Sequence, residues 1–290
     1  MIAAAIVVAV ALAAPLVAAA AAGGADDILR AIEQAPLTGE EKQVLSDQVR
    51  AALQSGVPAE DVDIIVTRSI ERGASATTLG RFLDTATQVA RQGLPIRPVL
   101  DRIEQGLSKG VPPERIDAAG KRLADGLAEA KLLTDSLLRN GLLPGAGGAY
   151  DAALETVARA GEQGLSTGTM QGLAEKVRAR GQSLEQFERA VRTRAFLAGS
   201  GMQAEAADRV VHACIDRNLT ERDYARLERT VSDMVRQGKD MDDIVRAADQ
   251  KVREGRGHGE GRESGKQDRG AGSRDAGNSR DAGSRSMRGK

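Results

Sequence analysis

The chain has 290 residues, with 41 basic and 41 acidic side chains, a single Cys, no Trp, two Tyr and three Phe. The central part, residues 23–254, carries a net charge of −4, which argues against a dedicated nucleic-acid-binding surface. A single cysteine excludes an intramolecular disulfide framework. Hydrophobic residues make up 41% of the chain, so we expect a core of aliphatic side chains and alanine.

The first element is an apolar stretch over residues 1–22, which has no charged side chain and is interrupted by Pro15. It ends in Ala20-Ala21-Ala22-Gly23, and such small residues are typical of a signal-peptidase site. About 20 apolar residues would also span a membrane. We favour a cleaved signal peptide, which would place the protein in the periplasm or outside the cell. An uncleaved anchor formed by residues 2–22 is the alternative.

After this stretch, glycine recurs at alternating separations of 17 and 20 residues, so that two units make a period of 37. One exception is an asparagine, the non-glycine residue that best tolerates the left-handed backbone of a helix C-cap. We therefore interpret the series as helix ends. The predicted caps are Gly56, Gly73, Gly93, Gly110, Gly164, Gly181, Gly201, Asn218 and Gly238, and Gly255 continues the spacing.

Helix starts follow these caps. Pro, Ser, Thr or Asp comes shortly after every cap except Gly201, and these residues suit the first turn of a helix. Capping boxes are predicted at Thr38 with Glu41, at Ser183 with Gln186 and, more weakly, at Thr220 with Asp223. An apolar residue stands six positions beyond each marker, which predicts equivalent inward-facing positions: Val62, Leu79, Val99, Ile116, Met170, Phe187, Ala207, Tyr224 and Ile244.

The pattern predicts twelve helices, each bounded by these signals. Their expected ranges are 25–35, 39–55, 58–72, 76–92, 95–109, 112–140, 149–163, 167–180, 184–199, 203–217, 221–237 and 241–254. Helices this short are marginal alone, so we expect them to stack. The predicted fold class is all-α: α-hairpin repeats of about 37 residues in a solenoid-like or irregular helical array.

The glycine spacing is interrupted between Gly110 and Gly164. These are 54 residues apart, three fewer than units of 20, 17 and 20 require, and Ala130 stands where a cap is expected. This predicts one long helix over 112–140, followed by a flexible Gly-rich loop over 141–148. The loop would separate a repeat region at 23–140 from a second at 149–254. Aligning Gly56 with Gly164 pairs the halves as Ser75 with Ser183, Leu79 with Phe187, Leu94 with Met202 and Ile103 with Val211.

The last segment, residues 255–290, consists mainly of Gly, Arg, Ser and Asp, with nine basic and five acidic residues. It has too little apolar surface to offset its ordering entropy, so a disordered tail is expected. We interpret it as a passive tail; the alternative is a weak electrostatic tether to an anionic surface.

Two segments share a G-V-P-x-E-x-[IV] signature: Gly56 to Val62 and Gly110 to Ile116. This resembles a signature in uncharacterised exported bacterial proteins built of helical repeats. The resemblance covers about residues 40–255 and implies no activity or catalytic residue. The hairpin length is also similar to that of tetratricopeptide-like repeats, but the Trp and the patterned Tyr, Ala and Phe of that family are absent.

Candidate chemistry is sparse. His212 and Cys214 are two positions apart, which places them on different faces of a helix, and we expect Cys214 to be a small buried residue. The carboxylates at 60–63 and 240–243 are expected to stabilise helix starts. The glycines at 145–148 resemble a linker more than a phosphate loop. Arginines with neighbouring glutamates predict a solvated surface with i,i+4 pairs: Arg178, Arg180, Arg189, Arg192 and Arg194, with Glu175, Glu185 and Glu188.

We therefore predict no catalytic residue, no cofactor and no metal site. The expected function is that of a non-catalytic, exported scaffold that binds a protein partner in the cell envelope. The alternatives are a membrane-anchored module of the envelope surface and, less favoured, an enzyme with an unrecognised carboxylate site.

Overall fold

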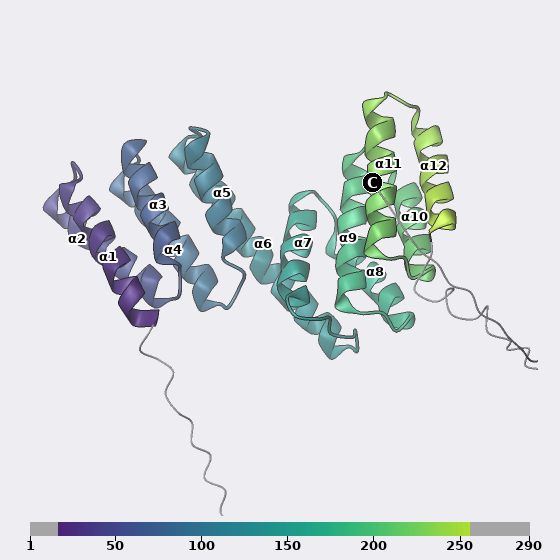
Figure 1. Cartoon of the computed structure of the whole chain (residues 1–290), viewed down its shortest axis with the longest axis horizontal. Coiled ribbons are helices and arrows are strands. Elements are labelled where there is room, and N and C mark those ends of the chain that lie inside the picture. The colour runs from purple at the N-terminus through teal and green to yellow at the C-terminus, as the bar shows by residue number, and fades with distance from the viewer. Residues whose placement is uncertain (1–16, 256–290) are drawn as a thin grey trace, which may run out of the picture.

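A computed structural model describes residues 17–255, and residues 1–16 and 256–290 lie outside the described part. Within it the chain is all-helical (Figure 1), with one isolated bridge between Leu143 and Ser183. The helices are α1 (Val17–Gln34), α2 (Gly39–Gln54), α3 (Ala59–Glu71), α4 (Ala76–Arg91), α5 (Arg97–Ser108), α6 (Pro113–Arg139), α7 (Ala149–Glu162), α8 (Thr167–Ala179), α9 (Leu184–Gly199), α10 (Ala204–Asp216), α11 (Glu221–Arg236) and α12 (Met241–Glu254).

These ranges confirm the predicted all-α array, with one extension. Helix α1 begins at Val17 and not at residue 25, so the backbone of the expected cleavage site at 20–23 is helical. Most of the apolar stretch and nearly all of the tail lie outside the described residues. The predictions made for those two segments are therefore not addressed by the structure.

The helices stack in two rows, giving the elongated array of Figure 1. Most helices pack against the next helix in the chain and the one after it. We call α1, α3, α5, α8, α10 and α12 the first row, and α2, α4, α6, α7, α9 and α11 the second row. Polar bonds recur at the repeat spacing: Arg97 Nη1 donates to Asp61 Oδ1 at 2.7 Å, and Gln48 Nε2 to Asp84 Oδ2 at 3.1 Å, each across 36 residues.

All nine predicted caps have a positive φ, and Asn218, with φ 49°, is the single non-glycine residue of the described chain that does. At each, the residue after the cap donates its N–H to a carbonyl five positions back, as Leu94 does to Val89 at 3.1 Å. This is the Schellman arrangement, which satisfies carbonyls that would otherwise lack a partner. Gly255 differs: its φ is −63°, so α12 does not end in a left-handed residue. The glycine spacing therefore continues at Gly255 without forming a left-handed cap there.

Helix starts mostly follow the predicted chemistry. Both Thr38 with Glu41 and Thr220 with Asp223 form complete capping boxes. The box expected at Ser183 is wrong, because its hydroxyl bonds to Glu185 and makes no cap bond. The Gln186 amide instead donates to Asn218 Oδ1 at 2.9 Å and to the Leu219 carbonyl at 3.2 Å.

The core is a continuous aliphatic cluster that runs the length of the array. All nine predicted inward-facing residues are buried, from Val62 to Ile244. Cys214 is fully buried, and burial raises the pKa of its thiol to about 12. Tyr224 is also fully buried, and burial raises the pKa of its hydroxyl.

The loop after α6 is not the free linker that its composition predicts. Leu142 is buried, the Leu143 carbonyl accepts from Leu184 N at 2.9 Å, and Ala146 N donates to Glu185 Oε1 at 2.5 Å. The Ser183 hydroxyl and the Ala146 N–H hold the pKa of Glu185 below its ordinary value. The loop is therefore bound to the start of α9, and this bond network takes Ser183 away from capping.

Candidate functional site

The most distinctive feature of the array is a position without a helix in its first row. Helix α7 follows α6 in the second row, so that row passes directly from one repeat region to the next. The first row has no helix between α5 and α8. The alignment of Gly110 with Asn218 makes α10 the counterpart of α5, and α11 the counterpart of α6. Helix α12 packs against both α10 and α11. The α5–α6 face thus lacks the helix that its counterpart carries.

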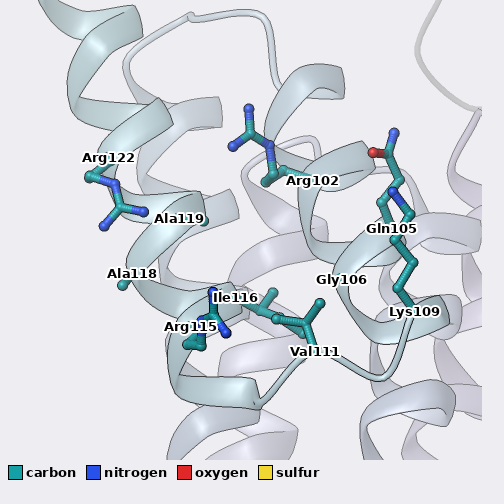
Figure 2. A pocket seen from close by; sticks show the side chains of 10 residues that line it. All are labelled: Arg102, Gln105, Gly106, Lys109, Val111, Arg115, Ile116, Ala118, Ala119 and Arg122. Atoms are coloured by element: carbon teal, nitrogen blue, oxygen red, sulfur yellow. The ribbon is translucent and has the colours of Figure 1, made fainter. Parts of the chain in front are cut away.

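This face is hollowed. One hollow of about 390 Å³ lies between the C-terminal half of α5 and the N-terminal half of α6 (Figure 2). A larger hollow of about 750 Å³ lies between the middle of α6, the end of α7 and the start of α8. Arg122 lines both. We call the two together the α5–α8 groove.

The smaller hollow is basic. Its lining includes no carboxylate and four basic side chains: Arg102, Lys109, Arg115 and Arg122. Figure 2 shows them around an apolar floor that includes Ile116 and Val111. Arg102 Nη2 pairs with Glu162 Oε2 of α7 at 3.1 Å. The other three make no ion pair within the described part of the chain, so their charges are available to a ligand.

The larger hollow is more apolar and of mixed charge. Its lining includes the buried residues Ala130, Leu133, Val157, Ala158 and Met170. Leu132 also lines it and is 72% exposed, the highest value for a large hydrophobic side chain in the described residues.

The lining of the larger hollow also includes three carboxylates of α6 and α7: Asp125, Glu129 and Glu162.

Local sequence explains why these side chains line one surface. On α5, Arg102, Gln105 and Lys109 are spaced by three and four residues, so they share one face. Gly106 allows α6 to approach closely, because an added Cβ would lie 2.6 Å from Ile116 Cγ1. Between α6 and α7, a Cβ added at Gly126 would be in ordinary contact with Ala158, 3.7 Å from its Cβ. The apolar floor of the groove is therefore made by closely packed helices.

The ends of the first-row helices carry a repeated contact that involves the groove. In α3, α8 and α10 the C-cap residue is an arginine that reaches the C-terminal end of the next helix in the row. Arg72 Nη2 donates to the Ser108 carbonyl at 3.3 Å, Arg180 Nη2 to Asp216 Oδ1 at 2.7 Å, and Arg217 Nη1 to the Arg253 carbonyl at 3.4 Å. Lys109 is the C-cap of α5. The position after α5 in the first row has no helix, so Lys109 has no helix end to contact and lines the groove instead.

The other candidate residues from the sequence have structural surroundings. His212 is partly buried on α10, two positions from the buried Cys214. Asp61, buried, pairs with Arg97, and the Asp240 side chain caps α12 by accepting from Asp242 N at 2.8 Å. Over residues 24–255 no group of three or more His, Cys, Asp or Glu is arranged to hold a metal ion.

The predicted arginine surface is only partly correct. Among its residues, Arg192 with Glu188 forms an i,i+4 pair at 3.2 Å. The others act mainly between helices: Arg178 donates to the Asn140 carbonyl, Arg180 pairs with Asp216, Arg189 with Glu221, and the buried Arg194 with Asp208. Helical packing brings these partners together, which i,i+4 counting within one helix could not detect.

Sequence reasoning missed the basic groove, although a signal existed. In the alignment of the two halves, three cations of the first half stand opposite uncharged or acidic residues of the second half. The pairs are Arg102 with Val210, Arg115 with Asp223, and Arg122 with Thr230. A gain of positive charge at equivalent positions indicates that the two faces meet different surroundings.

Within residues 17–255, no helix combines the length and the apolarity that crossing a bilayer requires. No protein-family model, no curated protein and no solved structure matches the chain.

Proposed function

We propose that this protein is a non-catalytic scaffold that binds another protein, and that it acts after export, in the periplasm or outside the cell. The observation that carries the proposal is the α5–α8 groove: a position in a helical row that has no helix, with an apolar floor and the exposed Leu132 beside it. Helical repeat arrays offer extended surfaces of this kind to protein partners. Exposed apolar surface with a polar rim is typical of an interaction site.

The apolar stretch at residues 2–22 supports the export part of the proposal and also its alternative, a module anchored in the membrane. Mass spectrometry of the mature N-terminus separates the two. A chain that begins near Gly23 fits export with cleavage, and a chain that retains residues 2–22 fits the anchor.

The enzyme alternative has less support. It needs carboxylates that converge in an enclosed cleft. The three carboxylates of the groove lie in an open hollow, and Glu162 is already paired with Arg102.

Crosslinking followed by quantitative mass spectrometry tests the scaffold proposal. The full chain, the L132R variant and the V235R variant are expressed and crosslinked in cells. Val235 is 40% exposed and lies on α11, away from the groove, so it is the matched control. We expect one partner to be depleted at least several-fold by L132R and not by V235R. A chain that is recovered alone as a monomer in all three cases would contradict the proposal.

A further inference from the structure

We infer that the α5–α8 groove seats an amphipathic helix from a partner protein, with acidic side chains of that helix against Lys109, Arg115 and Arg122. This rests on the proposed scaffold function and names the chemistry of its partner. The packing of α12 on α10 and α11 is the template for the seat.

The apolar part of the template is the first step. Helix α12 buries Ile244, Ala248 and Val252, which are spaced by four residues and form one stripe. Its C-terminal end lies on Leu219, since a Cβ added at Gly255 would be 2.7 Å from Leu219 Cδ2. Val111 is the counterpart of Leu219 and lines the groove. The groove therefore offers an apolar seat in the same register.

The orientation is the second step. Arg217 binds the C-terminal end of α12 through the Arg253 carbonyl, and Lys109 is the counterpart of Arg217. Three first-row C-cap residues contact the C-terminal end of a neighbouring helix, whereas Lys109 has no helix beside it to contact. A helix seated parallel to α5 would bring its C-terminal carbonyls to Lys109. These carry partial negative charge, which a cation stabilises.

The charge of the occupant is the third step. The alignment pairs Arg102, Arg115 and Arg122 with Val210, Asp223 and Thr230, so the open face is the more basic of the two at these positions. On the covered face α12 meets a cation with an acid, since Arg209 Nη2 pairs with Asp249 Oδ2 at 3.8 Å.

The smaller hollow of the groove has no carboxylate in its lining. Arg102 is already paired with Glu162, but Lys109, Arg115 and Arg122 have no ion pair in the described residues. A helix that covers the smaller hollow therefore removes these three charges from water without compensation unless it brings acidic groups of its own. These acidic groups belong over the smaller hollow and not over the larger one, whose lining includes Asp125, Glu129 and Glu162. Charge complementarity thus selects an acidic helix.

The same argument disfavours segments of this chain as occupants. Helix α12 is already packed on α10 and α11 of its own chain. Its last turn carries Lys251 and Arg253 with one acid, Glu254, so in a second copy it would bring more positive than negative charge toward Lys109 and Arg115. The segment 255–290 carries more basic than acidic residues and is disfavoured for the same reason. A separate protein with an acidic helix is the occupant that fits.

Three fluorescent peptides based on residues 240–255 test the inference; their binding to the full chain is measured by fluorescence anisotropy. The first is unchanged, the second carries R246E, K251E and R253E, and the third carries D242K, D243K and D249K. All three keep the apolar stripe. We expect the acidic peptide to bind about tenfold more tightly than the unchanged one, as three partly exposed ion pairs allow, and the basic peptide to bind most weakly.

The matched variant is the K109E/R115E double substitution, which should reverse this order. Lys109 and Arg115 make no ion pair in the described residues, so the variant is expected to fold, and its circular dichroism and melting temperature verify this. A K109Q/R115Q variant, which should abolish the preference without reversing it, gives the same test should the charge reversal impair folding.

Two outcomes overturn the inference. One is equal binding of the three peptides, or an order that the double substitution leaves unchanged. The other is tighter binding of the unchanged peptide together with dimers of the full chain, which would assign the groove to a second copy. Neither would contradict the scaffold proposal, because the L132R crosslinking experiment measures partner binding without assuming what the partner is.

Discussion

The α10–α11 face and the α5–α6 face occupy equivalent places in the two halves of the array, and one is covered while the other is open. On the covered face, helix α12 buries Ile244, Ala248 and Val252. On the open face the groove carries four basic residues around an apolar floor. The long helix α6 accounts for the difference: it leads directly into α7 in the same row, so the chain omits one first-row helix. A change in the length of one helix has thus exposed a surface that the repeat ordinarily buries.

The largest expected effect is a loss of stability when the packing of α12 on the covered face is disrupted. Replacing the fully buried Ile244 by Ala should lower the free energy of unfolding by about 2–4 kcal/mol, because it removes methyl groups and leaves a cavity. The control is Leu132→Ala beside the open face, where a 72% exposed side chain should change stability by no more than about 0.5 kcal/mol. Urea unfolding of both variants measures the contrast. Equal losses would mean that the groove is closed in solution.

The second prediction concerns the helix caps, which both halves share. Gly93 and its counterpart Gly201 have φ of 62° and 91°, and neither has a clashing neighbour where a Cβ would stand. Replacement of either by Val should therefore cost about 1–2 kcal/mol from backbone strain alone. Gly172→Ala, within α8 and with open space around it, should stabilise by up to about 1 kcal/mol. Unchanged melting of the Gly93 variant would contradict the cap assignment.

The third prediction uses the buried thiol of Cys214 on α10. The pKa of Cys214 is raised from 9.0 to about 12 by burial, so between these values the unfolded chain releases its thiol proton and the folded chain keeps it. The contribution of this residue to stability is therefore present below pH 9 and is lost as the pH rises toward 12, by about 1 kcal/mol per unit. Urea unfolding at pH 8 and pH 10 measures it. Cys214→Val should reduce the loss of unfolding free energy between pH 8 and pH 10. An identical loss in both proteins would contradict the raised pKa of Cys214.

The smallest effect compares the two equivalent C-caps. Arg217→Gln should lower stability by about 0.5 kcal/mol, because it removes an exposed contact with the end of α12. Lys109→Gln should have no measurable effect, because Lys109 has no such contact in the described residues. Thermal melts in parallel measure the difference. A larger loss for the Lys109 variant would indicate that an unrecognised segment of this chain already covers the groove.

Much of the secondary structure followed from local chemistry. The caps, the two capping boxes at Thr38 and Thr220, and the long helix around Ala130 depend on interactions within a few residues. A left-handed φ demands Gly or Asn, and a free N–H at a helix start demands a nearby oxygen. Such requirements are written in the sequence at the place where they act.

The tertiary structure decided what depends on neighbours distant in the chain. It placed α7 in the row of α6, bound the 141–148 loop to the start of α9, and so took Ser183 from the cap that its sequence predicts. It also gathered Arg102, Lys109, Arg115 and Arg122 around one hollow. Sequence periodicity alone predicts that each helix has a buried face. Which faces meet a neighbouring helix, and which remain open, depends on how the helices stack.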